Sequence, residues 1–91
     1  MLFLEFLAIK PCRHDAYEAV PKRKVSLDLD ECERVLSGKG YEILSNPRVM
    51  LVMRKEVEIT LYPHGRLLMQ PVNDKRLAVR IAEELFSSLG M

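Results

Sequence analysis

The stretch that decides the fold is residues 48–90, RVMLVMRKEVEITLYPHGRLLMQPVNDKRLAVRIAEELFSSLG. It opens with three short apolar runs, at residues 48–54, 56–62 and 66–70. The charged pair Lys55-Glu56 separates the first two runs, and Pro63-His64-Gly65 separates the last two. Short apolar runs between such turn residues are typical of antiparallel strands, and glycine readily adopts the positive φ that many tight turns require. The stretch therefore predicts three consecutive strands joined by tight turns.

Alternation within these runs predicts a sheet with two different faces. Side chains of successive residues point to opposite faces of a strand. One face of the last two strands is entirely apolar and comprises Val57, Ile59, Leu61, Leu67 and Met69. The other face carries Glu58, Thr60, Tyr62, Arg66, Leu68 and Gln70. We therefore expect the first set to form the core and the second set to lie on an open or partner-covered face.

The end of the stretch predicts a long amphipathic helix that covers the sheet. Asn73 is a favourable N-cap, Asp74 suits the first turn, and Gly90 ends the pattern. Between them an apolar stripe recurs at helical spacing and comprises Leu77, Ala78, Ile81, Ala82, Leu85, Phe86 and Leu89. A stripe of this width indicates that the helix packs over one face of the sheet.

A second helix is predicted upstream, beginning at Asp28. Asp28 followed by Glu31 is a variant of the capping box, in which the aspartate accepts hydrogen bonds from early backbone N–H groups. The apolar face of this helix and its expected end comprise Leu29, Cys32, Val35, Leu36 and Gly38. We therefore expect Cys32 to be a small core residue. A short strand at residues 41–44 follows and is closed by Asn46-Pro47.

The N-terminal run, residues 2–10, is apolar on both faces of the strand that it predicts. Such a strand is normally covered on both faces, and at a sheet edge it invites pairing with another chain. Two interpretations stay open: a central strand of the monomer, or a homodimer seam with the dimer-strand residues Phe3, Leu4, Phe6 and Leu7. Residues 11–24 are expected to be irregular, with one or two helical turns before Pro21.

In chain order these elements predict a strand, a helix, four strands and a helix. This order favours a single α+β domain over residues 1–91. We expect an antiparallel sheet of about five strands, with both helices on one face and the other face open.

The region 24–90 resembles one repeat of the TATA-box-binding protein family, which has this order of elements. The resemblance rests on SLDLDE at 26–31, MLVMRKE at 50–56, ITLYPHGRLL at 59–68 and NDKRLAV at 73–79. It implies a TATA-box-binding-protein-like domain over residues 1–91, in which 11–24 is an irregular inserted loop. That family carries two repeats in one chain, so a single repeat implies a saddle built by a homodimer joined through its first strand.

The resemblance also implies where a nucleic acid would bind. The family bends DNA by wedging paired phenylalanines between base steps. Tyr62 stands at one such position, and no aromatic residue stands near Asn46-Pro47, where the other would be. Leu68 and Gln70 correspond to DNA-facing valine and threonine positions. Glu58 would point at the duplex, which is unfavourable beside phosphates.

Composition and charge favour some classes of function over others. The 91 residues include 14 Lys and Arg against 13 Asp and Glu, a formal net charge of +1. Domains held to nucleic acid by bulk charge are usually strongly basic, so this balance favours a protein partner. No run approaches the ~18–20 apolar residues of a membrane helix, and the start shows no signal-peptide pattern. With two cysteines only, we expect a cytoplasmic protein without a disulfide framework, and its Glu, Lys and Arg content suits a thermophile.

Four residues could ligate a metal: Cys12, His14, Cys32 and His64. Their spacing matches no standard zinc finger, in which ligands come in closely spaced pairs. Cys12 and His14 would share one side of a strand, but no third group orients them for catalysis. We therefore expect no metal, no cofactor and no enzymatic activity. A small Cys/His metal or catalytic protein is the third alternative.

Two functions remain, and both use one candidate binding face. This face comprises Arg48, Arg54, Thr60, Tyr62, Arg66, Leu68 and Gln70. In the favoured hypothesis the chain is a non-enzymatic module that binds a second copy or a larger protein through this face and its first strand. In the alternative it binds nucleic acid, with the arginines on phosphates and Tyr62 stacked against bases.

Overall fold

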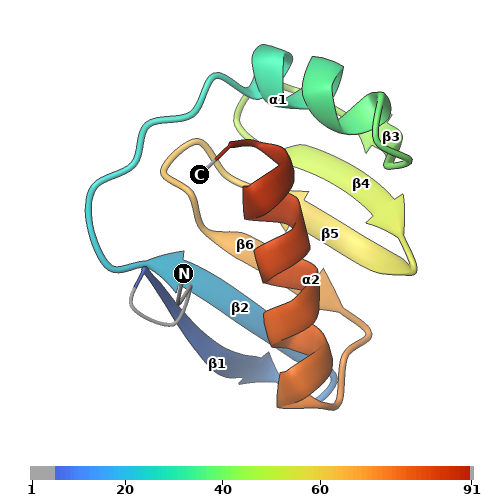
Figure 1. The fold of residues 1–91 in the computed structure, drawn as a ribbon. Coiled ribbons are helices and arrows are strands. Elements are labelled where there is room, and N and C mark those ends of the chain that lie inside the picture. Colours follow the sequence, from blue (N-terminus) through green and yellow to red (C-terminus); the bar gives the residue numbers. More distant parts are fainter. Residues whose placement is uncertain (1–5, 91) are drawn as a thin grey trace.

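The structure, a computed structural model, describes residues 6–90. Within them the chain forms one six-stranded antiparallel sheet and two helices (Figure 1). The elements are β1 (Leu7–Arg13), β2 (Ala16–Pro21), α1 (Leu29–Ser37), β3 (Glu42–Ser45), β4 (Leu51–Lys55), β5 (Val57–Leu61), β6 (Leu67–Gln70) and α2 (Lys75–Ser88). The predicted α+β class is confirmed, and the sheet has one strand more than the expected five.

The order of strands across the sheet is β1-β2-β6-β5-β4-β3. Neighbouring strands follow one another in the chain except at β2 and β6, where Tyr17 pairs with Met69 and Ala19 with Leu67. This one long-range pairing joins the N-terminal hairpin to the rest of the sheet. As a result, β5 and β6 occupy the centre of the sheet, and β1 and β3 form its two edges.

The core lies between the sheet and the helices. In Figure 1, α2 runs across the sheet and α1 lies beside β3. The sheet buries Leu51, Met53, Ile59, Leu61, Leu67 and Met69 against these helices. The helices contribute Leu29, Cys32, Leu36, Ala78, Ile81, Ala82, Leu85 and Phe86. Each fully buried Leu, Ile or Phe stabilises the fold by about 1.5–3 kcal/mol. The alternation correctly predicted the core positions of β5 and β6, which are Val57, Ile59, Leu61, Leu67 and Met69.

Both helices begin at an aspartate that caps them. The Asp28 carboxylate accepts hydrogen bonds from the backbone N–H groups two and three residues ahead, at 3.0 and 3.4 Å, as predicted. The N-cap of α2 is Asp74 and not Asn73, because the Asp74 carboxylate accepts from the Arg76 N–H at 2.9 Å. Aspartate and asparagine cap helices about equally well, so their residue types alone do not decide between two neighbours.

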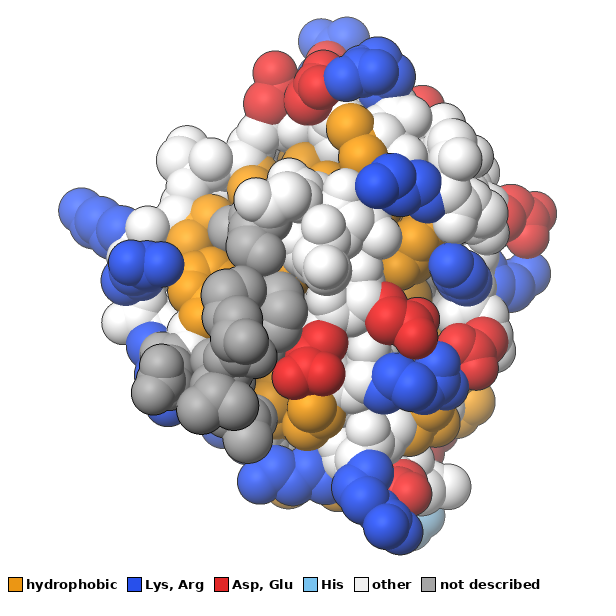
Figure 2. Space-filling view, in the orientation of Figure 1, with side chains coloured by type: hydrophobic (Ala, Val, Ile, Leu, Met, Phe, Trp, Pro, Cys, Tyr) orange, Lys and Arg blue, Asp and Glu red, His pale blue; other side chains and the backbone are white. Residues whose placement is uncertain are grey.

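Charged side chains lie on the outer surface of the helices. Figure 2, which views the molecule from the helix side, shows acidic and basic side chains interspersed over this surface. Arg80 of α2 contacts Glu84 at 3.3 Å on its own helix and Glu56 in the β4–β5 turn at 3.0 Å. Arg34 and Glu31 pair on α1. These surface pairs contribute modestly to stability, because water screens them.

Most of the segment 11–24 is regular, in contrast to the expected loop, because residues 11–21 lie in two strands and the turn between them. It contains the end of β1, a tight turn at His14-Asp15 and the whole of β2. The helical turns expected before Pro21 do not form, because this segment pairs with β1 on one side and with β6 on the other. Two sets of ladder hydrogen bonds outweigh the weak strand propensity of its alanine and glutamate residues.

The first strand lies at an edge of the sheet and not in its centre. β1 covers Leu7–Arg13, whereas the sequence predicted a strand at 2–10. Within the described part of the chain β1 has one neighbouring strand, β2, so the central-strand interpretation is wrong. The apolar character of the strand has another cause, which is its contact with α2.

Two of the four predicted dimer-strand residues, Phe3 and Leu4, lie outside the described residues. The other two take part in the core. Leu7 is buried, and the ring of Phe6 meets the ring of Phe86 edge-on at 5.9 Å. Phe6 and Leu7 therefore serve packing within the chain.

The turn between β5 and β6 is held against the segment that precedes α1. Gly65 has a φ of 95°, which favours glycine. A Cβ at this position would lie 2.7 Å from Cγ of Pro21 and 3.3 Å from Cβ of Val25. The Leu27 N–H also donates to the Pro63 carbonyl at 2.8 Å. Both the backbone conformation and the close approach therefore require glycine here.

Candidate functional site: the open face of the sheet

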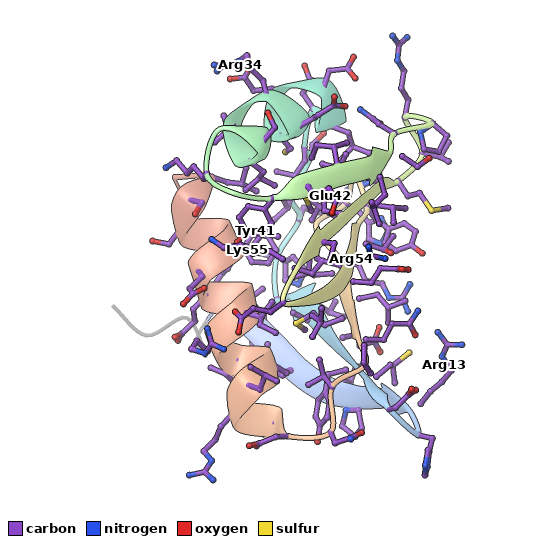
Figure 3. All side chains as sticks on the ribbon, turned by 90° about the vertical axis from the view of Figure 1, so that its right-hand side faces the viewer. Arg13, Arg34, Tyr41, Glu42, Arg54 and Lys55 are labelled. Carbon is purple, nitrogen blue, oxygen red and sulfur yellow. The ribbon has the colours of Figure 1, made fainter. Side chains whose placement is uncertain are left out.

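The candidate site is the side of the sheet that carries no helix. Residues paired across neighbouring strands share a face, so the strand register fixes its members. They include Lys10, Arg13, Glu18, Glu42, Val52, Arg54, Glu58, Thr60, Tyr62, Arg66, Leu68 and Gln70. We call this set the open face. In Figure 3, the labelled Arg13 and Arg54 of this face point away from both helices.

An apolar row crosses the centre of the open face. Leu68 of β6 pairs with Thr60 of β5, and Thr60 pairs with Val52 of β4. Leu68 and Val52 are half-buried, and Thr60 is only 9% exposed although no helix covers it. Thr60 is shielded because larger apolar side chains flank it on both neighbouring strands. The centre of the open face therefore resembles the core of an interface more than a solvated surface.

Arg66 and Glu18 form the most protected ion pair of the open face. Nε of Arg66 donates to Oε1 of Glu18 at 2.6 Å, from β6 to β2. Their side chains are 32% and 17% exposed, less than in any other ion pair within residues 6–90. The hydrogen bond to Glu18 is the main cause of the raised pKa of Arg66. The charge of Arg66 is thus already matched inside the chain.

Tyr62 stands directly after β5, at the margin of the open face. The guanidinium carbon of Arg66 lies 5.3 Å from the centre of the Tyr62 ring. The centre of the His64 ring lies 5.8 Å from the centre of the Tyr62 ring. These two contacts hold the aromatic ring in place. Fixed aromatic side chains are enriched in protein interfaces and also serve as stacking platforms for bases.

A second row of the open face carries charges of both signs. Arg54 pairs in register with Glu42 on one side and with Glu58 on the other. Glu58 pairs with Gln70, whose Oε1 accepts a hydrogen bond from Nη2 of Arg13 at 2.9 Å. Within residues 6–90, none of the four charged members of this row has an oppositely charged atom within 4.0 Å. Ion pairs within residues 6–90 therefore do not neutralise the charges of this row.

An open depression of about 560 Å³ lies along this row. It is lined by Arg13, Asp15, Arg54, Glu56, Val57, Glu58, Gln70 and Pro71. Its two arginines are balanced by three carboxylates. The depression therefore does not concentrate charge of one sign, as a site for a phosphate would.

Arg48 lies outside the open face, although the sequence placed it there. β4 begins at Leu51, and Arg48 has a φ of 74° in the preceding loop, which is incompatible with a strand. Its Nε lies 3.7 Å from the Asp30 carboxylate on α1, and its N–H donates to Oδ1 of Asn46 at 3.0 Å. The structure brings together the other six predicted residues, which are Arg54, Thr60, Tyr62, Arg66, Leu68 and Gln70.

Six members of the open face were not predicted as part of the binding site, namely Lys10, Arg13, Glu18, Glu42, Val52 and Glu58. Glu58 was predicted on this side of the sheet, but as an unfavourable neighbour for a duplex. Arg13 and Glu18 were missed because the segment 11–24 was expected to be a loop, and Lys10 because the predicted strand 2–10 was not given a place in the sheet. The two-residue turn His14-Asp15 contains no glycine or asparagine, so the sequence lacks the usual hairpin signal between β1 and β2. Glu42 and Val52 join the face only through the pairing of β4 with β3 on one side and with β5 on the other.

The four potential metal ligands do not converge. Sγ of Cys12 lies 3.9 Å from Nη2 of Arg66 on the open face, while His14 and His64 occupy separate turns. Cys32 is buried in the core as predicted, and burial raises the pKa of its thiol, followed in effect by two nearby carboxylates. Within residues 6–90, no three His, Cys, Asp or Glu side chains are grouped so that they could hold a metal ion.

Two further results bear on the site. No helix in residues 6–90 has the length and apolar character needed to cross a membrane. Comparisons with protein-family models, with curated proteins and with solved structures found no match to the chain. The chemistry of the open face is therefore the basis for a functional proposal.

Proposed function

We propose that this chain is a non-enzymatic binding module that contacts another protein through the open face. The observation that supports this proposal is the apolar row of Leu68, Thr60 and Val52, flanked by charges of both signs. Protein interfaces combine a desolvated centre with a polar rim. Surfaces that bind nucleic acid instead gather positive charge on one face.

The surroundings of the arginines also favour a protein partner. Arg66 is paired with Glu18, and Arg54 stands between Glu42 and Glu58 in the register. A duplex that approached this face would bring its phosphates close to these three carboxylates. The resulting repulsion would offset the attraction of the arginines. A protein partner, in contrast, supplies charges of both signs.

A single charge at the centre of the face tests the proposal. Leu68→Glu should abolish binding of the partner and leave the fold intact, because Leu68 is half-buried and lies outside the core. The wild-type chain and the variant are each immobilised and incubated with an extract of the native host. Free wild-type chain is added to the extract so that binding of a second copy is also detected. Retained proteins are then identified by mass spectrometry. The matched control is Val49→Glu, at a residue 63% exposed in the loop before β4.

The control should retain the same proteins as the wild-type chain. Two results would contradict the proposal. One is a wild-type chain that retains no protein, its own copy included. The other is a set of proteins that Leu68→Glu retains unchanged.

Nucleic-acid binding is the second candidate, and the order of elements favours it. From β2 to α2 the chain runs strand, helix, four strands, helix. This is the order of the TATA-box-binding protein repeat that residues 24–90 resemble. In this alternative the domain is one half of such a saddle, Tyr62 stacks against bases and Arg54 contacts a phosphate.

Titration of labelled duplex and single-stranded DNA and RNA at low salt tests this alternative. Arg54→Glu is the informative variant, because Arg54 has no ion pair within the described residues that the change would break. If Arg54 contacts a phosphate, this variant should raise Kd at least tenfold, which corresponds to a loss of about 1.4 kcal/mol of binding free energy. Absence of binding at micromolar protein would contradict this alternative.

A further inference from the structure

We infer that the protein bound by the open face is a second copy of this chain. The two copies pack open face against open face about a two-fold axis that runs parallel to the strands, between β5 and β6. This inference rests on the proposed protein-binding function and specifies its partner. Its basis is that the open face is complementary to itself about this axis, both in the order of its strands and in the distribution of its charges.

The strand order determines which elements meet. Because the sheet reads β1-β2-β6-β5-β4-β3, the axis places β6 over the partner's β5 and β1 over the partner's β3. At the centre, Leu68 and Thr60 are register partners, so Leu68 faces the partner's Thr60. The same contact occurs twice, once on each side of the axis. Leu68 and Thr60 of both copies are thereby removed from water together.

The two edges of the open face carry opposite charges. Lys10 and Arg13 lie on β1, and Glu42 lies on β3. Glu42 and Arg13 stand at the two ends of one row, which the register continues through Arg54, Glu58 and Gln70. The axis therefore brings Arg13 over the partner's Glu42, and Glu42 over the partner's Arg13. Two equivalent ion pairs form at the rim of the dimer.

The charge pattern selects this axis over the perpendicular one. A two-fold axis across the strands would turn each residue of the central row onto its own copy. Lys10 and Glu18 belong to this row, since they pair with each other and Glu18 pairs with Leu68. Lys10 would then face the partner's Lys10, and Glu18 the partner's Glu18. Like charges in contact oppose association, so the axis parallel to the strands is the compatible one.

Backbone pairing through β1 is a weaker route to a dimer. The Phe6 carbonyl accepts from the Lys22 N–H at 2.7 Å, so every second residue of β1 counted from Phe6 bonds to β2. The residues between them direct their backbone groups outward. Pro11 is one of these residues and has no N–H to donate. Proline on an edge strand interrupts addition of a further strand, which leaves the open face as the surface for a second copy.

Sedimentation equilibrium of the full chain, from about 1 µM to about 1 mM, tests whether the dimer forms. We expect twice the monomer mass at the upper end of this range. Charge reversal then tests the axis. Arg13→Glu and Glu42→Arg should each raise Kd by about tenfold, because each change turns both rim ion pairs into like-charge contacts. The combined variant restores opposite charges and should return Kd to within about threefold of the wild-type value.

The matched control is Arg76→Glu, which makes the same change of charge on the helix side. The Arg76 side chain is 95% exposed and belongs to α2, so this variant should leave Kd unchanged. Circular dichroism of every variant verifies that the fold is retained. Leu68→Glu, at the centre of the face, should abolish the dimer.

Each other outcome overturns a defined part of the inference. A chain that is monomeric at about 1 mM overturns the dimer. If that monomer still binds a different protein, and Leu68→Glu prevents this, the proposed function stands and the inference alone fails. If no partner is lost in Leu68→Glu, both fail. A dimer that Leu68→Glu disrupts but that neither charge reversal weakens overturns the axis.

Discussion

Leu67 and Leu68 are neighbours on β6, yet they belong to two different surfaces of the molecule. Leu67 points to the helices and is fully buried, while Leu68 points to the open face and is half-buried. The residue type, the strand and the central position are the same. The difference lies in what covers each side chain: α2 and α1 on one face, and no described element on the other.

This difference shows that an apolar residue in a central strand can be buried by its own chain or left for another molecule to cover. On the covered face, apolar side chains meet partners that the chain itself supplies, and their burial stabilises the monomer. On the open face, the row through Leu68 and Thr60 gains burial only when another molecule covers it. Substitutions on the covered face should therefore change the free energy of unfolding, and substitutions on the open face should change association.

The largest expected effect separates the two leucines. Leu67→Ala leaves a cavity in the core and should lower the free energy of unfolding by about 2–5 kcal/mol. Leu68→Ala should lower it by less than about 1 kcal/mol, because part of this side chain is already in water in the monomer. Urea denaturation measures both values at a protein concentration at which the chain is monomeric. Equal losses would show that the two faces are packed alike.

The covered face could be predicted because its signals are local in the sequence. The alternation at 56–62, the Pro63-His64-Gly65 turn and the apolar stripe of the last helix each specify one element without knowledge of the rest. β5, the turn that follows it and α2 confirm these three predictions.

The open face could be predicted only in part, because half of it depends on contacts between distant residues. Glu18 reaches its partner Arg66 over 48 positions in the sequence. The strand that carries Glu18 is rich in residues that do not favour strands, and its pairing with β1 and β6 decides its structure. Arg48 shows the opposite error, because an apolar run continued past the point where a positive φ ends the strand.

A smaller effect is expected within the open face, between two of its arginines. Arg66→Ala removes the partner of Glu18, whose side chain is only 17% exposed, and should lower the free energy of unfolding by about 1–2 kcal/mol. Arg54→Ala should change it by less than about 0.5 kcal/mol, because Arg54 has no ion pair within the described residues. Denaturation measures the loss in Arg66→Ala and in Arg54→Ala. Glu18→Gln, alone and combined with Arg66→Ala, then gives the coupling energy between Glu18 and Arg66. The same loss for both arginines would show that the ion pair of Arg66 with Glu18 adds nothing to stability.

The smallest effect is expected where the two faces meet, at the β4–β5 turn. The hydrogen bond from Arg80 lowers the pKa of Glu56 below its ordinary value of 4.5. The unfolded chain therefore binds a proton at higher pH than the folded chain, so this pair stabilises the fold above pH 4.5. That contribution is lost as the pH falls through the lowered pKa of Glu56.

Glu56→Gln should accordingly reduce stability slightly at pH 7 and lose this effect in acid. Denaturation at pH 7 and at about pH 3 measures the difference. The control is Glu58→Gln, which removes a carboxylate without an ion pair in residues 6–90 and should not change stability at pH 7. A deficit in Glu56→Gln that persists unchanged in acid would speak against the Arg80 contact.

The close packing of Gly65 also governs how the chain meets a protease. Lys22-Arg23-Lys24 places three consecutive trypsin sites in a segment without regular secondary structure. A protease must first pull such a segment away from the fold, and the free energy of this local opening sets the rate. Here Pro21 packs against Gly65, and the Leu27 N–H donates to the Pro63 carbonyl. Opening of the segment therefore has to break its contacts with the β5–β6 turn. This basic segment should therefore be cut far more slowly than an untethered loop of the same sequence.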